Sequence, residues 1–275
     1  MRKFSLAYLT IPGIDPVRQI HIARETGYDT VSLRTIPMGL PGEPRARLAK
    51  DPALFKEVAA ALDETKMPLL DIELARIRED LNVDDYEPEF EKGAELGASQ
   101  VLLSVWTDWQ KNRDFTIAQF EKVCDHAAKY NLTINLEFVC VAGIRTLAQA
   151  LDLLDTAARP NAKIMVDMFH AFRAGLDPKE LAAVPKNTLG IIHLCDAPAE
   201  VSDMDVPTMT PIMREGRLYA GEGASYIVGY VSAMPADAPV SIELPNSKEI
   251  AELGEVGHAK RCIETARKFF ADHNL

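Results

Sequence analysis

Short apolar runs alternate with amphipathic segments along the whole chain. Eight of these runs are rich in β-forming residues, and their approximate ranges are 4–10, 28–34, 67–73, 100–106, 133–139, 162–168, 189–195 and 239–244. Strands that alternate with helical patterns are typical of repeated βα units, which build a parallel sheet. We therefore predict an α/β fold with eight strands.

The segments between these runs carry signals for helix starts. Asp15, Asp51 and Asp177 each precede a proline, so each offers an N-cap acceptor directly before a residue suited to the first helical position. Apolar residues recur at helical spacing within 114–130 and again within 259–270. These patterns predict helices that cover a sheet with one apolar face.

Eight βα units can close into a barrel or lie open as a doubly wound sheet, and periodicity fits both. No G-x-G-x-x-G sequence follows an early strand, which disfavours an open sheet that binds a dinucleotide. Segment 196–224 is long and irregular, and in a barrel it would be a βα loop over the catalytic face. We predict that residues 1–275 form one domain, a single (β/α)8 TIM barrel.

Net charge and hydropathy exclude two classes of partner. The 41 acidic and 30 basic residues give a formal charge of -11, which repels a phosphate backbone, so we expect no nucleic acid partner. Ser5, Tyr8 and Thr10 interrupt the first apolar run, which we interpret as a strand and not as a leader peptide. No apolar run approaches the ~18 residues that span a bilayer, so we expect no membrane partner.

Cysteine usage indicates the compartment. The four cysteines are scattered and form no C-x-x-C pair; they are Cys124, Cys140, Cys195 and Cys262. This spacing disfavours zinc ribbons and dithiol redox motifs, and it fits a reducing cytoplasm, which is the location we predict. The sequence leaves both a monomer and a homo-oligomer open.

Ionisable residues recur on the last four predicted strands, each opposite an apolar face. They are Glu137, Asp167, His193 and Glu243. Side chains alternate along a strand, so the apolar face packs on helices while the ionisable one points into the barrel. Three carboxylates and an imidazole at one mouth would repel one another and lose hydration without a cation. We predict a site for one divalent metal ion, and Mn2+, Mg2+, Co2+ and Zn2+ all suit these donors.

Each of these four residues has a simpler explanation when it is taken alone. An acidic residue at a strand end is more often a salt-bridge partner or a helix cap than a metal ligand. A single histidine on a strand is usually a hydrogen-bonded core residue. The recurrence on four consecutive strands is what favours the metal site.

Polar and aromatic residues also lie at the ends of three earlier predicted strands. They are Arg34, Glu73 and Trp106. A buried Arg34–Glu73 ion pair, or simple packing, would explain the first two of them, but we select Glu73 as a substrate-binding candidate. Trp106 is the third, and we predict that it lines the pocket, with Trp109 adding to an apolar wall.

Five short motifs resemble those of the xylose isomerase-like TIM-barrel superfamily. They are L-E-F at 136–138, V-D-M-F-H at 166–170, H-L-C-D at 193–196, R-L-Y-A-G-E-G at 217–223 and S-I-E-L at 241–244. Each motif is weak singly, and their order makes the resemblance specific. The superfamily includes sugar and sugar-phosphate isomerases, ketose 3-epimerases, inosose and dehydroshikimate dehydratases, and endonuclease IV.

This resemblance implies roles for individual residues. It implies that the four ionisable strand residues ligate the metal and that Glu137 and Glu243 act as acid and base from opposite sides of the substrate. His170 matches a histidine that binds a substrate oxygen. Arg217 matches a substrate-contacting arginine, with Arg214 as the alternative because the loop length blurs the match.

Two members of the superfamily fit less well. The ketose 3-epimerases carry a second glutamate about six residues after the strand-five ligand, where this chain has no acid in 140–143. Endonuclease IV needs a histidine-rich site and a basic DNA-binding face, whereas this chain has six histidines and a pI near 5.1. We therefore reject the nuclease and disfavour a strict ketose 3-epimerase.

Our leading hypothesis is a divalent-metal-dependent isomerase or epimerase that acts on a sugar, sugar phosphate or related polyol carbonyl compound through an enediolate. A metal-dependent dehydratase of an inosose, keto-sugar or dehydroshikimate-like substrate is the close alternative, because the first step is the same. A non-catalytic carbohydrate-binding accessory protein is the alternative of another class. In all three the partner is a small carbohydrate-like molecule.

Overall fold

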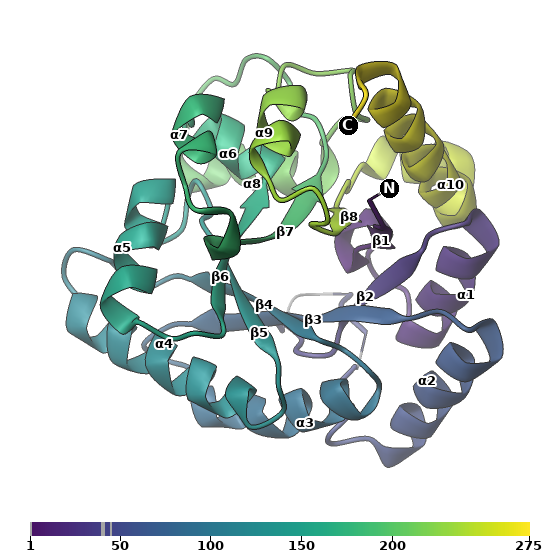
Figure 1. The fold of residues 1–275 in the computed structure, drawn as a ribbon. Helices are drawn as coiled ribbons and strands as arrows, with labels where there is room; N and C mark the ends of the chain where they lie inside the picture. The colour runs from purple at the N-terminus through teal and green to yellow at the C-terminus, as the bar shows by residue number, and fades with distance from the viewer. Residues whose placement is uncertain (1, 40–41, 45) are drawn as a thin grey trace.

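Eight parallel strands close into a barrel in sequence order, with β8 paired to β1 (Figure 1). The structure is a computed structural model that describes residues 2–39, 42–44 and 46–275. The strands are β1 (Phe4–Leu6), β2 (Thr30–Arg34), β3 (Leu69–Ile77), β4 (Gln100–Val105), β5 (Thr133–Glu137), β6 (Ala162–Asp167), β7 (Leu189–Leu194) and β8 (Val240–Ile242). Each of them lies in one of the predicted runs or overlaps it, and the closed barrel confirms the predicted fold class.

Helices form a ring outside the barrel (Figure 1). They are α1 (Pro16–Thr26), α2 (Pro52–Thr65), α3 (Glu87–Glu95), α4 (Arg113–Ala128), α5 (Leu147–Ala157), α6 (Met168–Arg173), α7 (Pro178–Ala182), α8 (Val206–Glu215), α9 (Ile227–Ala233) and α10 (Ser247–His273). Among the described residues, no helix combines the length and the apolar character that a membrane crossing requires.

The predicted helix starts are confirmed by side-chain caps. Asp15 accepts a hydrogen bond from the backbone N–H of Arg18 at 3.0 Å, and a proline occupies the first turn of α1. Asp51 and Asp177 cap α2 and α7 in the same way. A carboxylate at this position satisfies backbone donors that the first helical turn leaves unpaired.

Two predicted segments differ from the structure. The predicted strand 4–10 ends at Leu6, and Tyr8–Thr10 forms a short 3-10 helix, because the Thr10 hydroxyl bonds the backbone of β8 at Ile242 O (2.6 Å) and of Leu244 just beyond it (3.1 Å). Segment 196–224 is not irregular throughout, since it contains α8. Met209 and Met213, one helical turn apart, bury the inner face of that helix.

The interior of the barrel is filled beneath the predicted metal ligands. Side chains two residues earlier on the same strands also point inward, because strand side chains alternate. Met165 and Ile191 form a buried apolar cluster with Leu74 and Leu102. The barrel is therefore a packed core, and the space for a ligand lies at the carboxyl ends of the strands.

Asn135 occupies the same inner layer and requires a glycine opposite it. Its amide nitrogen donates to Gln100 Oε1 at 2.8 Å, and its Oδ1 accepts from the backbone N–H of Ile191 at 3.3 Å. A Cβ placed on Gly190 would lie 2.0 Å from Asn135 Oδ1. The side chain of Asn135 thus uses the space that a side chain at position 190 would need.

We predict that Gly190→Ala lowers the free energy of unfolding by about 1–3 kcal/mol, the usual cost of overpacking a core. Urea denaturation measures the effect. The double variant Asn135→Ala/Gly190→Ala should lose less stability than the sum of the two single variants, because removing Asn135 relieves the clash. Additive losses would show that the contact between positions 135 and 190 is not the cause.

Candidate metal centre and substrate cavity

The four predicted metal ligands meet at the mouth of the barrel. Glu137 and Asp167 are the last residues of β5 and β6, His193 lies near the end of β7, and Glu243 directly follows β8. One donor atom from each lies within 4.8 Å of the others, and all four side chains are buried. Parallel strands place their carboxyl ends on one rim, which is why residues far apart in sequence converge here.

This donor set suits a divalent cation. Among the described residues, the imidazole Nδ1 of His193 is buried without a hydrogen-bond partner, and it lies 3.4 Å from Glu243 Oε2 and 3.9 Å from Asp167 Oδ2. Buried polar atoms without partners are costly in folded proteins and mark places where an ion or a water fits. Carboxylate oxygens with one imidazole nitrogen are ligands that Mn2+, Mg2+, Co2+ and Zn2+ accept.

The pKa values of Glu137 and His193 reflect a surplus of buried negative charge. Burial, together with the carboxylates of Asp167 and Glu243, raises the pKa of Glu137 well above its ordinary value. Burial by itself would lower the pKa of His193, but the surrounding carboxylates, above all Glu243, raise it to about 10. A dication would offset this surplus directly.

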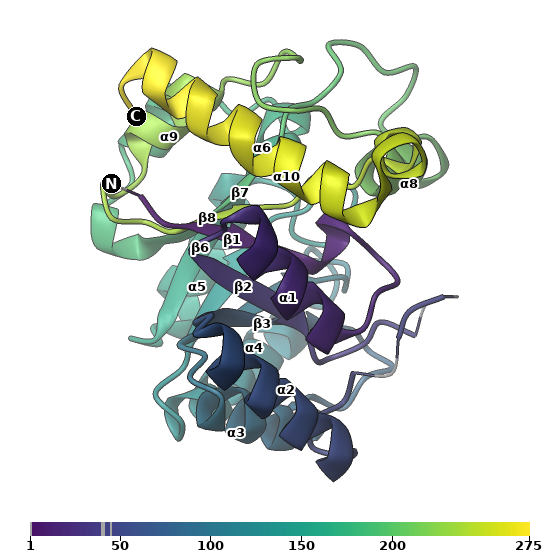
Figure 2. The same cartoon turned by 90° about the vertical axis from the view of Figure 1, so that its right-hand side faces the viewer.

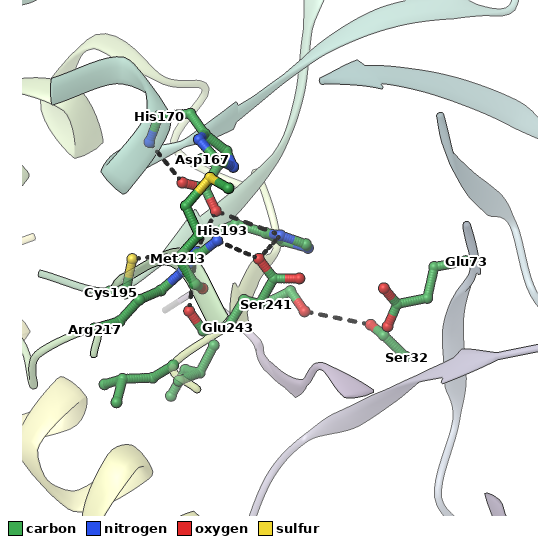
Figure 3. Close-up of polar contacts among 12 residues, drawn as sticks. Ser32, Glu73, Asp167, His170, His193, Cys195, Met213, Arg217, Ser241 and Glu243 are labelled. Atoms are coloured by element: carbon green, nitrogen blue, oxygen red, sulfur yellow. Dashed lines mark hydrogen bonds and ion pairs between the residues drawn. The ribbon is translucent and has the colours of Figure 1, made fainter. Parts of the chain in front are cut away.

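Arg217 is built into the same cluster (Figure 3). Its guanidinium is buried, donates to Asp167 Oδ2 at 2.6 Å, and lies 3.0 Å from Glu243 Oε2. Its Nε donates to the backbone oxygen of Met213 at 2.9 Å. Arg217 therefore orients two of the candidate ligands, whereas Arg214, the alternative from the sequence, is exposed on α8 at the cavity rim.

Asp196 positions the loop that carries Arg217, a role that the sequence analysis missed. Its carboxylate accepts backbone N–H groups from Gly221 (3.1 Å), Gly223 (2.9 Å) and Ser225 (2.9 Å). Its own backbone pairs with Leu218, next to Arg217. The aspartate of the H-L-C-D motif was the available signal, because a buried acid directly after a strand needs donors nearby.

A cavity of about 570 Å³ opens at this end of the barrel, and two of the candidate metal ligands, Glu137 and Glu243, line it. Its wall includes every predicted substrate-binding residue: Glu73, Trp106, His170 and Arg217. Trp109 is the exception to the expected aromatic wall. It packs against the guanidinium of Arg113, 5.1 Å from the ring centroid, and lines a separate pocket, so its prediction is wrong.

The end of α8 packs beside the start of α10, and the two helices close one side of this cavity. Gly216, just after α8, forms an antiparallel bridge with Asn246, the N-cap of α10, so the two helix ends lie side by side (Figure 2). Met213 and Ile250, one from each helix, line the cavity. The long segment after β7 thus contributes a wall of the site.

His170 lies beside the candidate metal ligands, and both its backbone N–H and its imidazole ring have partners. Its backbone N–H donates to Asp167 Oδ1 at 2.9 Å, and its Nδ1 lies 3.4 Å from Cys140 Sγ. Burial lowers the pKa of His170 to about 4, so the ring is neutral near pH 7. A neutral imidazole on the cavity wall can donate to or accept from a substrate oxygen.

Glu73 both forms the expected ion pair and lines the cavity. Its Oε2 accepts from Arg34 at 3.1 Å, and its Oε1 accepts from the backbone N–H of Tyr8 at 3.1 Å. Glu43 lies on the other side of Arg34 at 3.2 Å. Figure 3 shows Glu73 apart from Arg217, and both residues line the cavity, so a bound molecule would lie between two charged clusters.

Curated relatives match part of the chain. A 3-dehydroshikimate dehydratase of Pseudomonas putida is 26% identical over 171 residues, which is 60% of this chain and 26% of that protein. An inosose isomerase of Bacillus subtilis is 27% identical over 160 residues, which is 55% of this chain and 52% of that protein. This chain therefore matches about a quarter of the dehydratase and about half of the isomerase.

A solved structure and a protein family each match nearly all of this chain. The IolI protein, solved with a bound zinc atom, has a TM-score of 0.77 at 21% identity, and the match covers 98% of this chain and 97% of that one. At this identity the likeness concerns the fold. Residues 20–272 match the family described as xylose isomerase-like TIM barrel. The chain belongs to the xylose isomerase-like TIM barrel family.

Proposed function

We propose that this protein is a divalent-metal-dependent isomerase or epimerase that acts on a sugar, sugar phosphate or related polyol carbonyl compound. The observation that carries the proposal is the buried group of three carboxylates and one imidazole, two of whose members, Glu137 and Glu243, line a cavity of about 570 Å³. The inosose isomerase match supports it. The zinc atom of the IolI structure supports a divalent metal.

The chemistry requires proton transfer at carbon next to a carbonyl group. Glu137, Asp167, His193 and Glu243 would hold the metal, which supplies electrophilic stabilisation to adjacent carbonyl and hydroxyl oxygens and so acidifies the carbon-bound proton. One of the two glutamates takes that proton, the C–H electron pair forms the C=C bond of an enediolate, and the carbonyl π pair moves onto the carbonyl oxygen. In isomerisation the other glutamate returns a proton to the neighbouring carbon, and the proton of the hydroxyl group passes to the former carbonyl oxygen. In epimerisation the other glutamate returns a proton to the opposite face of the same carbon.

Two further side chains would prepare the site for this step. Arg217 fixes the carboxylates of Asp167 and Glu243 by direct contacts. These side chains therefore lose less conformational freedom when a substrate binds. His170 presents a neutral ring to the cavity beside them. The two residues thus orient the ligands and a substrate oxygen, and neither needs to exchange a proton with carbon.

A metal-dependent dehydratase is the second candidate, because the matched dehydratase shares 26% identity over 171 residues. It would begin with the same proton abstraction. The enediolate would then expel the β-hydroxyl group, which takes up the proton held by a glutamic acid and leaves as water, instead of being reprotonated at carbon. The product distinguishes the two reactions: dehydration changes the elemental composition of the substrate, and isomerisation does not.

A solvent-exchange screen tests the proposed function. The protein is supplied with Mn2+ in deuterated water and offered ketoses, inososes and cyclic keto acids, and deuterium at carbon is measured by mass spectrometry. We expect deuterium exchange at carbon in at least one compound. We also expect a new isomer with the same elemental composition, apart from the deuterium. A compound that binds without exchange would instead indicate a carbohydrate-binding protein.

We predict that the purified protein binds about one divalent ion per chain. Its melting temperature should rise with added Mn2+, because the ion binds the folded state. Asp167→Asn and His193→Ala should each weaken binding by more than ~10²-fold, beyond the loss typical of residues that only orient a ligand. Elemental analysis and thermal-shift titration give the measurement.

Asp108→Asn is the matched control for that experiment, because Asp108 is an exposed carboxylate of the same type outside the cluster. Its metal affinity should equal that of the parent. If the parent protein contains no bound metal and its melting temperature does not change with added metal, the predicted metal site is wrong.

We predict that Glu137→Gln and Glu243→Gln retain metal but lose turnover by at least ~10²-fold, the usual contribution of a positioned acid or base. Glutamine keeps the size and one ligand oxygen while removing the basic group. One of the two variants should still exchange the substrate proton with solvent, because abstraction survives when only reprotonation is blocked. Steady-state rates and deuterium exchange are compared at equal metal occupancy. Near-parental rates in both variants would show that the two glutamates act only as metal ligands and not as acid and base.

A further inference from the structure

The two buried arginines of the cavity, Arg34 and Arg217, are already paired with carboxylates. Arg34 lies 3.1 Å from Glu73 and 3.2 Å from Glu43, and its guanidinium is buried. Arg217 makes two such contacts with Asp167 and Glu243. An anionic substituent of a ligand could pair with either arginine only by displacing a carboxylate, which would leave that carboxylate buried and unpaired.

The remaining lining residues add no surplus of positive charge. Among the described residues of the cavity wall, the third arginine is Arg214, which lies next to the wall residue Glu215 at the rim. The acidic wall residues are Glu43, Glu73, Glu137, Glu215 and Glu243. A bound dication would compensate for this excess of acid without reversing it. The chain as a whole, with a formal charge of -11, also repels anions.

The backbone donors that could bind a phosphate near β7 are also occupied. In TIM barrels a phosphate commonly binds at the loops after strands seven and eight, on backbone N–H groups and a helix N-terminus. Here Asp196 accepts the N–H groups of Gly221 and Gly223. After β8, Asn246 caps α10, and Glu249 places an acid in its first turn.

We infer that the cavity takes an uncharged polyol carbonyl compound and disfavours phosphorylated or carboxylated ones. The inference rests on the proposed function and specifies its substrate class. Glu73 and Arg34 together present acceptors and donors suited to hydroxyl groups, while Trp106 supplies an apolar face. The Arg34–Glu73 pair is thus a specificity determinant, because it recognises hydroxyl groups while Glu73 withholds the arginine from anions.

Binding of matched compounds to the Mn2+-loaded protein tests this inference. Calorimetry compares D-fructose with D-fructose 6-phosphate, D-tagatose with D-tagatose 6-phosphate, and an inosose with dehydroshikimate. We expect the uncharged member of at least one pair to bind at least ~10-fold more tightly than the charged member. Tighter binding of the charged members, or no binding of any uncharged compound, would overturn the inference.

Glu73→Gln should shift this preference toward anions, because it releases one side of Arg34. We expect the ratio of affinities, phosphorylated over uncharged, to rise at least ~10-fold. Glu215→Gln is the matched control: it removes the same charge from the cavity wall but leaves Arg34 and Arg217 paired. Glu43→Gln provides a second release of Arg34 if Glu73→Gln folds poorly.

An equal rise in Glu215→Gln would show that total charge, and not the pairing of Arg34, sets the preference. Failure of the inference remains distinct from failure of the proposed function. The binding ratios require no turnover, whereas the proposed function fails if no compound in the panel exchanges deuterium while metal is bound.

Discussion

The negative charge buried at the mouth of the barrel is the constraint to which the rest of this end of the molecule is adjusted. Three carboxylates converge there because parallel strands end on one rim, and in a low dielectric they cannot all ionise unaided. Arg217 contacts two of them, and the pKa of Glu137 rises well above its ordinary value. A divalent cation would complete this balance.

Keeping Arg217 in that position requires the loop after β7. Asp196 accepts three backbone N–H groups of the glycine-rich segment, and its bridge to Leu218 holds the chain beside the candidate metal ligands. The end of α8 meets the start of α10 at the next bridge. One buried aspartate thus links the electrostatics of the site to the shape of the cavity wall.

The same neutralisation has a consequence for specificity. We infer that a site whose two buried arginines are each held by two carboxylates favours hydroxyl groups, which exchange hydrogen bonds without adding charge. The sugar-acting relatives of the family and the proposed enediolate chemistry agree with such a cavity. In this proposal the arginine cluster around Arg34 serves recognition, whereas the cluster around Arg217 serves the metal site.

The sequence by itself determined the strands, the helix caps and the inward position of the four metal-ligand candidates, because alternation and capping are local properties of the chain. It could not decide which residues share a cavity. Trp106 and Trp109 are three residues apart, yet only Trp106 lines the main cavity. The choice between Arg217 and Arg214 and the role of Asp196 likewise depended on contacts across 20 or more residues. Tertiary structure decided these points, because burial and charge pairing arise only when distant strand ends and loops meet.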